Sequence, residues 1–140
     1  DNVGAYSGIT ILDVSSSVGS VVKLECHTPA MDHATMVWVR MRDEQLIAIG
    51  QNKYIDDTRF QVHHTVEDST ESWNLLISSA IREDAGIYQC LSQNASYLQA
   101  PNNTPITNQL FRIRISAPVI PFPALPAFVP TTEVYSALDQ

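Results

Sequence analysis

The feature that most constrains this chain is its pair of cysteines, Cys26 and Cys90, which stand 64 residues apart. Trp38 follows the first cysteine by twelve residues, and the second cysteine closes the motif Asp84-x-Gly86-x-Tyr88-x-Cys90. Two cysteines are too few for a four-ligand zinc site without histidines, but they suffice for one disulfide. The spacing therefore predicts a Cys26–Cys90 bond between two distant strands.

Short apolar segments separated by turn-prone residues predict an all-β fold. The turn-prone clusters include residues 15–17, 43–44, 56–57 and 67–72. Strands this short, at this spacing, are typical of a sandwich of two antiparallel sheets. The segments expected as strands are residues 9–14, 20–26, 35–41, 45–49, 59–65, 73–78, 86–92 and 109–115.

The residues around the cysteines specify which sandwich is expected. In an immunoglobulin-like sandwich a tryptophan packs on the inter-sheet disulfide, and a tyrosine before the second cysteine bonds back to the chain. Trp38 and Tyr88 stand at those positions, and Gly86 allows a tight entry into the last cysteine strand. Residues 45–55 supply two extra strands before Arg59. The sequence predicts an immunoglobulin-like two-sheet Greek-key sandwich of the variable (V/I-set) type.

A more specific resemblance rests on four short motifs within residues 9–115. These motifs are Trp38-Val39-Arg40, Ile49-Gly50, Asp57-x-Arg59-Phe60 and Trp73-x-Leu75-x-Ile77. With them the chain resembles the first immunoglobulin domain of the invertebrate neuronal adhesion group, which comprises Dpr and DIP proteins, lachesin and ZIG proteins. Vertebrate IgLON proteins look like more distant relatives.

The resemblance implies a structural ion pair and a mode of binding. The ion pair is Arg59–Asp84. Proteins of this group lie at the cell surface or are secreted, and they pair with other immunoglobulin domains through the sheet of strands G, F, C, C′ and C″. The group usually continues into a second immunoglobulin domain, whereas a proline-rich segment follows here. Either the chain is a one-domain relative or it is cut.

The domain limits follow from composition. Residues 1–8 are expected to be a flexible N-terminus, and residues 9–116 the immunoglobulin-like domain. Residues 117–130 carry prolines at positions 118, 121, 123, 126 and 130. Because proline removes the donor that a central strand needs, residues 117–140 are expected to form an extended linker or tail.

A partner-binding face can be predicted from the alternation of side chains along strands. Trp38 and Cys90 must point into the core, so their neighbours point outward. A solvated sheet face should be polar there, whereas most of these residues are apolar, and exposed apolar patches mark interaction sites. The segment at residues 45–49 adds apolar residues in either register. The residues expected to bind a partner are Val37, Val39, Met41, Ala48, Ile49, Gln89 and Leu91.

Charge and motifs argue against several other functions. The chain has 15 acidic and 8 basic residues and a formal charge of −7, which disfavours binding to nucleic acid. No apolar run is long enough for a membrane span. No catalytic motif, metal-ligand spacing or phosphate loop is present, so we expect no enzyme, no bound metal and no cofactor.

The expected setting is extracellular, either secreted or at the cell surface. Asn94-Ala95-Ser96 and Asn102-Asn103-Thr104 fit the N-glycosylation rule, so Asn94 and Asn102 are candidate glycan sites. The leading hypothesis is a cell-recognition module that binds another immunoglobulin-superfamily protein, homophilically or heterophilically. One alternative is a secreted immune-type binder that grips its ligand with loop 93–108. Another is a structural spacer, which should be polar on both outer faces.

Overall fold

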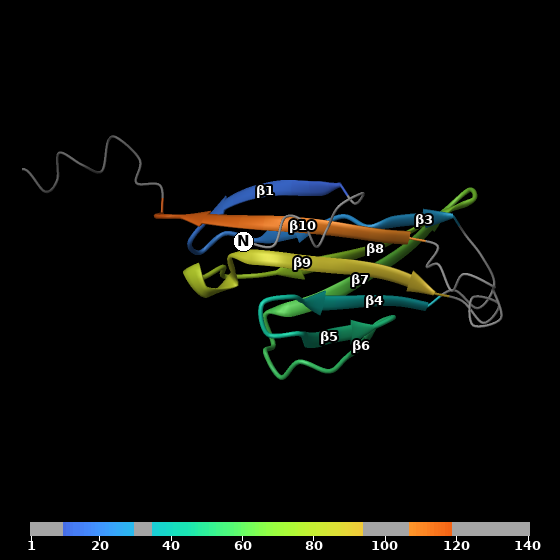
Figure 1. Cartoon of the computed structure of the whole chain (residues 1–140), viewed down its shortest axis with the longest axis horizontal. Coiled ribbons are helices and arrows are strands. Elements are labelled where there is room, and N and C mark those ends of the chain that lie inside the picture. Colours follow the sequence, from blue (N-terminus) through green and yellow to red (C-terminus); the bar gives the residue numbers. More distant parts are fainter. Residues whose placement is uncertain (1–9, 30–34, 94–106, 119–140) are drawn as a thin grey trace, which may run out of the picture.

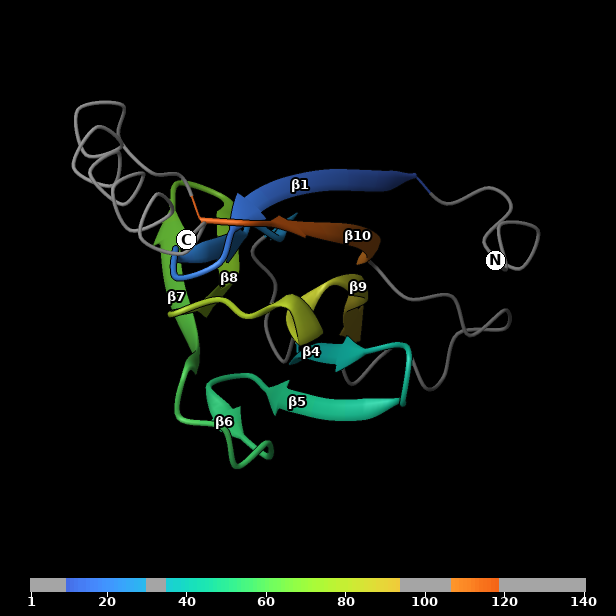
Figure 2. The ribbon, with the colours of Figure 1, turned by 90° about the vertical axis from the view of Figure 1, so that its left-hand side faces the viewer.

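The computed structural model describes residues 10–29, 35–93 and 107–118, which form two facing β-sheets (Figures 1 and 2). We call them the front sheet and the back sheet. The front sheet has the order β1-β10-β9-β4-β5-β6, and in the back sheet β8 pairs with β2, β3 and β7. The front strands are β1 (Ile11–Ser17), β4 (Thr35–Arg40), β5 (Gln45–Ile49), β6 (Asn52–Lys53), β9 (Gly86–Gln93) and β10 (Thr107–Ser116). The back strands are β2 (Val22–Leu24), β3 (His27–Pro29), β7 (Phe60–Glu67) and β8 (Thr70–Ile77).

The front sheet joins the two ends of the described chain. Figure 1 shows β1 in blue beside β10 in orange. These two strands run parallel, with Ile11 opposite Leu110 and Ser17 opposite Ser116, whereas the other pairs in this sheet are antiparallel. The expected strand at residues 9–14 therefore extends further, and the serines at 15–17, expected as a turn, lie in β1. Their pairing with β10 outweighs the low strand propensity of serine.

The back sheet contains one interruption that the sequence did not reveal. The expected strand at residues 20–26 contains only β2, and β3 begins beyond its expected end, at His27; the two strands pair with successive parts of β8. At the break, the Cys26 N–H donates to Asn74 Oδ1 at 3.3 Å and the Cys26 carbonyl accepts from the Trp73 N–H at 2.8 Å. At Cys26, the Asn74 side chain thus takes the place of one backbone hydrogen bond of the β ladder.

Turns elsewhere in the structure are tight. The turn expected over residues 67–72 is shorter, because β7 reaches Glu67 and β8 begins at Thr70. Asp68 adopts a φ of 56°, as two-residue hairpin turns require. Glu44 has a φ of 55° in the expected turn between β4 and β5. The short segment before β9 is a 3-10 turn, η2 (Arg82–Asp84).

The core fills the space between the sheets. Trp38 is fully buried, its ring centroid lies 5.4 Å from that of Phe111, and its indole N–H donates to the Trp73 carbonyl at 3.2 Å. The other large, fully buried side chains of this core come from both sheets, and they include Leu24, Met36, Ile47, Phe60, Leu75, Ile77, Tyr88 and Ile113. This packing fixes which side of each front strand faces outward.

The described strands run from Ile11 to Ser116. Residues 117 and 118 are exposed beyond β10. The flexible N-terminus expected at residues 1–8 and all but the first two residues of the expected linker lie outside the described residues, so both assignments stay predictions.

Candidate functional site

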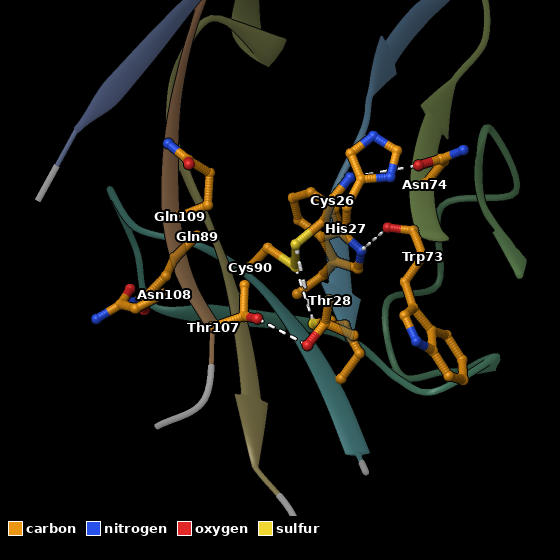
Figure 3. Close-up of a disulfide and its surroundings, with 12 residues drawn as sticks. Cys26, His27, Thr28, Trp73, Asn74, Gln89, Cys90, Thr107, Asn108 and Gln109 are labelled. Atoms are coloured by element: carbon orange, nitrogen blue, oxygen red, sulfur yellow. Dashed lines mark hydrogen bonds between the residues drawn. A yellow bond between two sulfur atoms is a disulfide. The ribbon is translucent and has the colours of Figure 1, made fainter. Parts of the chain in front are cut away.

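The disulfide fixes the inner side of the strands that carry the site. Cys26 and Cys90 are bonded, with their Cα atoms 6.5 Å apart, and the bond crosses between the sheets (Figure 3). Met36, on β4, packs its sulfur 2.9 Å from Cys90 Sγ. Thr107 of β10 donates a hydrogen bond to Thr28 of β3 at 2.8 Å, a second link between the sheets. Side chains that alternate with these residues on β4, β9 and β10 therefore point away from the core.

A second fixed point lies where the chain enters β9. The Tyr88 hydroxyl donates to the Asp84 carbonyl at 2.8 Å, and Gly86, with a φ of 131°, makes the turn between them. Arg59 donates to both carboxylate oxygens of Asp84, at 2.8 and 3.0 Å, so the pair implied by the family resemblance is formed. Hydrogen bonds to Asp84 and then to Asp57 raise the pKa of Arg59 above its usual value. The pKa of Asp57 is correspondingly lowered by Arg59.

The outward side chains of the front sheet form two central rows. The register places Ile49, Val37, Leu91 and Asn108 in the first row, and Leu46, Val39, Gln89 and Leu110 in the second. A third, flanking row contains Ile87 opposite Arg112, and the Met41 N–H donates to the Ile87 carbonyl at 2.9 Å. The structure thus brings together six of the seven residues expected to bind a partner.

Ala48 is the exception, and the expectation for it is wrong. Ala48 is fully buried in the core, opposite Trp38. A β-bulge at Trp38/Val39 shifts the register, so that Val39 pairs with Leu46 rather than with Ile47. A bulge lets two consecutive residues of β5, Ile47 and Ala48, face the core. Leu46 takes the outward place instead, and strict alternation along the sequence could not reveal this.

The rows contain one polar pair. Gln89 Nε2 donates to Asn108 Oδ1 at 2.8 Å. In Figure 3 the side chain of Asn108 lies on the side of β10 away from the disulfide, whereas that of Thr107 points toward it. The sequence alone does not single out Asn108, because its outward place depends on the register of β10 against β9.

Exposure on this face is partial. Val37, Val39, Met41, Leu46, Ile49, Gln89, Leu91 and Asn108 are all half-buried. Leu110 is fully buried although the register places it on the outer side, and it is not part of the core cluster between the sheets. The accessible apolar surface of the central rows therefore lies over β4, β5 and β9.

The outer face of the back sheet has a different composition. Alternation places Lys23 on this side of β2, Asn74 and Leu76 on β8, and Gln61 and His63 on β7. Lys23 Nζ lies 3.2 Å from Glu25 Oε2. The outer face of the back sheet is thus mainly polar and charged, as a solvated sheet face should be.

A serine, a histidine and a glutamate lie in line on the back sheet, as they do in some hydrolases. His27 Nδ1 is 2.7 Å from Ser72 Oγ, and His27 Nε2 is 3.5 Å from Glu25 Oε1. The side chains of His27 and Glu25 are more than half exposed on a strand surface. Such catalysis depends on a water-excluded site with oriented donors, so this line is best explained as surface hydrogen bonding.

Several expectations concern residues that the structure does not describe. Asn94, Asn102 and nearly all of loop 93–108 lie outside the described residues. Within the described ranges, no group of three acidic, histidine or cysteine side chains is placed to hold a metal ion. In the same ranges, no helix is long and apolar enough to cross a membrane.

Comparison with known proteins agrees with this architecture. The model of the immunoglobulin V-set domain family matches residues 11–108. No curated protein matches the chain.

Solved structures with a similar fold have low sequence identity to this chain. The complex of Dpr11 IG1 with DIP-gamma IG+IG2 is 20% identical with a TM-score of 0.62, covering 79% of this chain and 49% of that one. The ZIG-8 IG1 homodimer is 20% identical with a TM-score of 0.57, covering 81% and 84%. The NK cell receptor Nkp44 is 14% identical with a TM-score of 0.59, covering 76% and 99%.

This chain spans about half the length of the first of those chains. At these identities the structural likeness shows the fold alone, whereas the family model covers most of the described strands. The chain belongs to the immunoglobulin V-set family.

Proposed function

We propose that this chain is an extracellular recognition module that binds another immunoglobulin-like domain through the outer face of its front sheet. The observation that carries the proposal is the contrast between its two outer faces. The central rows of the front sheet contain no charged residue and are apolar apart from Gln89 and Asn108. The back sheet carries Lys23, Glu25 and His27 outward, and all three are exposed.

Exposing such an apolar face to water is unfavourable, so binding a partner that covers the face is favoured. Each apolar Å² that a partner covers contributes roughly 25 cal/mol. Half-buried Val37, Val39 and Leu91 lie side by side on β4 and β9. Hot spots lie near the centre of an interface, where a partner removes water completely, and these three side chains lie at the centre of the sheet.

The similar folds are consistent with this proposal. The ZIG-8 structure is a homodimer of IG1 domains, and the Dpr11 structure is a complex between immunoglobulin domains. Immunoglobulin domains of adhesion and receptor proteins are generally extracellular, and the disulfide fits an oxidising compartment. The chain is accordingly a secreted or surface protein that acts by binding rather than by catalysis.

The test is a screen of the tetramerised chain against a library of extracellular proteins, followed by charge substitutions. Val39→Asp and Leu91→Asp should each weaken binding by well over 2 kcal/mol, because a buried charge without a partner is costly. Leu76→Asp is the matched control, since Leu76 is half-buried on the outer face of the back sheet.

The proposal predicts that the control binds as the wild type does and that all three variants stay folded by circular dichroism. Folded Val39→Asp and Leu91→Asp chains that bind with wild-type affinity would refute it. A spacer role would require polar residues on both outer faces, which the central rows of the front sheet do not supply.

A further inference from the structure

The polar pair in the central rows leaves one hydrogen-bond acceptor and one donor group outside its own bond. The Gln89 and Asn108 side chains are joined by one hydrogen bond of 2.8 Å. Each amide has one carbonyl acceptor and one NH2 group. The bond therefore leaves the Gln89 carbonyl as an acceptor and the Asn108 NH2 group as a donor for other partners. If oxygen and nitrogen were exchanged in both amides, one acceptor and one donor would again be left.

Arg112 in the flanking row and Arg40 at the end of β4 are each paired with an aspartate of the same chain. Arg112 Nη1 lies 3.7 Å from Asp13 Oδ1 in the flanking row, and Arg40 Nη2 lies 3.0 Å from Asp43 Oδ2 at the turn after β4. The central rows themselves contain no charged residue. The formal charge of −7 is therefore carried by residues outside these rows.

We propose that the occupant of this face is a second copy of the same chain, held in register by Gln89 and Asn108. This inference rests on the proposed function and names the partner. In a two-fold symmetric contact, residue i of one copy meets residue j of the other and the reverse. Gln89 of each copy accepts a hydrogen bond from Asn108 of the other, which gives two equivalent bonds around the axis.

The apolar residues make these bonds effective. Val39 is paired with Gln89, and Leu91 is paired with both Val37 and Asn108, so apolar side chains flank both amides. When two copies meet, these side chains exclude water from the amide bonds, and hydrogen bonds are stronger in a low-dielectric surrounding.

A second copy fits this face better than an oppositely charged protein does. A basic partner would be attracted by the negative charge, but the central rows offer it no carboxylate. An identical chain automatically supplies one acceptor for each free donor. The neutral centre also means that two chains of charge −7 do not bring like charges together at the middle of the contact.

The test is sedimentation velocity of the whole chain over concentrations of roughly 1–100 μM, a range that detects micromolar self-association. The wild type should form a dimer. Gln89→Glu leaves only acceptors at position 89, and Asn108→Lys leaves only donors at position 108. Each variant alone should dimerise roughly tenfold to a hundredfold more weakly, because two like charges then lie around the axis and the original amide pair is broken.

A mixture of the two variants should restore the dimer. At one arm of the contact the carboxylate introduced at position 89 of one copy accepts from the ammonium introduced at position 108 of the other. At the second arm the original bond between Asn108 and Gln89 forms. Gln61→Glu is the control and should leave dimerisation unchanged, because Gln61 is exposed on the back sheet and the substitution is the same. Circular dichroism identifies folded variants, and either variant alone tests the amide contact if the other does not fold.

Salt provides an independent readout. Raising the salt concentration to about 0.15 M shortens the Debye length to about 8 Å and screens the repulsion between two acidic chains. The dimer should therefore tighten with salt, whereas a complex steered by opposite charge weakens.

A wild-type chain that stays monomeric over the whole range overturns this inference, as does a dimer that is indifferent to both variants. Neither result contradicts the proposed function if Val39→Asp still abolishes binding to a partner from the library. If Val39→Asp binds that partner as the wild type does, the proposed function itself fails.

Discussion

Arg59 and Asp84 form a bidentate ion pair where the chain turns into β9. The Asp84 side chain is only 3% exposed, and it also accepts the Ile81 N–H at 2.9 Å. Arg59 makes further bonds to Asp57 and to the Ser79 carbonyl at 3.0 Å. A single side chain thus ties together the start of β7, the end of β8 and the turn before β9.

Removal of this arginine should be strongly destabilising. Arg59→Met leaves the Asp84 carboxylate buried without its charge partner, which costs about 3–5 kcal/mol. Arg40→Met is the matched control, because the Asp43 side chain is 46% exposed, and it should cost less than about 1 kcal/mol. Urea unfolding measures both. Equal losses for the two variants would show that the Arg59 pair is not a structural element of the fold.

Tyr88 should make the domain sensitive to alkali. Burial, followed by the negative charge of Asp84, raises the pKa of Tyr88 to about 12 from 10.0. A pKa that is higher in the folded state gives stability that is present below pH 10 and is lost as the pH rises through 12. The loss should approach about 2–3 kcal/mol, at 1.36 kcal/mol for each pKa unit.

Tyr88→Phe is the control for this effect. It lacks the hydroxyl that donates to Asp84, so it should be less stable at neutral pH, with a flatter decline between pH 10 and 12. Chemical unfolding at a series of pH values measures both slopes. Identical slopes for the two chains would contradict the assignment of the alkaline loss to Tyr88.

At the scale of elements, β5 determines which residues reach the outer face. The bulge opposite Val39 turns both Ile47 and Ala48 inward and leaves Leu46 and Ile49 outward. The next strand, β6, consists only of the polar residues Asn52 and Lys53, and just after it the Tyr54 N–H donates to the Ile47 carbonyl at 2.8 Å. The apolar rows therefore end at β5 rather than continuing across the sheet edge.

This assignment predicts opposite outcomes for neighbouring positions of β5. Ala48→Asp places a charge in the core and should cost several kcal/mol or prevent folding. Leu46→Asp places the same charge on the outer face and should cost about 1 kcal/mol or less. Thermal unfolding followed by circular dichroism distinguishes them. A folded Ala48→Asp chain of near wild-type stability would mean that the bulge is elsewhere.

At the scale of the whole molecule, much of the fold could be predicted because its motifs can be recognised in the sequence without knowing which strands pair. The cysteine spacing, Trp38 and the motif ending at Cys90 define the two sheets, and alternation from Trp38 and Cys90 correctly indicates the outer sides of β4 and β9. The break at Cys26, the bulge in β5 and the place of Asn108 depend on pairing between distant strands. Alternation along one strand does not fix that pairing, because register also depends on the partner strand and on the turn that joins them.

The central claim is that the outer face of the front sheet is the binding surface, and a glycan placed on that face tests it most directly. Val39→Asn with Met41→Thr creates a glycosylation sequon whose two changed residues both point outward. Gln61→Asn with His63→Thr creates the matched sequon on the back sheet. Both chains are made in a secretory host, and mass spectrometry shows which of the new sites carries a glycan.

Binding of each glycosylated chain to the partner, or to the wild-type chain if it self-associates, is then measured by surface plasmon resonance. The account predicts that a glycan at position 39 abolishes binding and that one at position 61 leaves the affinity unchanged. Wild-type affinity with position 39 fully glycosylated, or loss of binding only with the glycan at position 61, would contradict it.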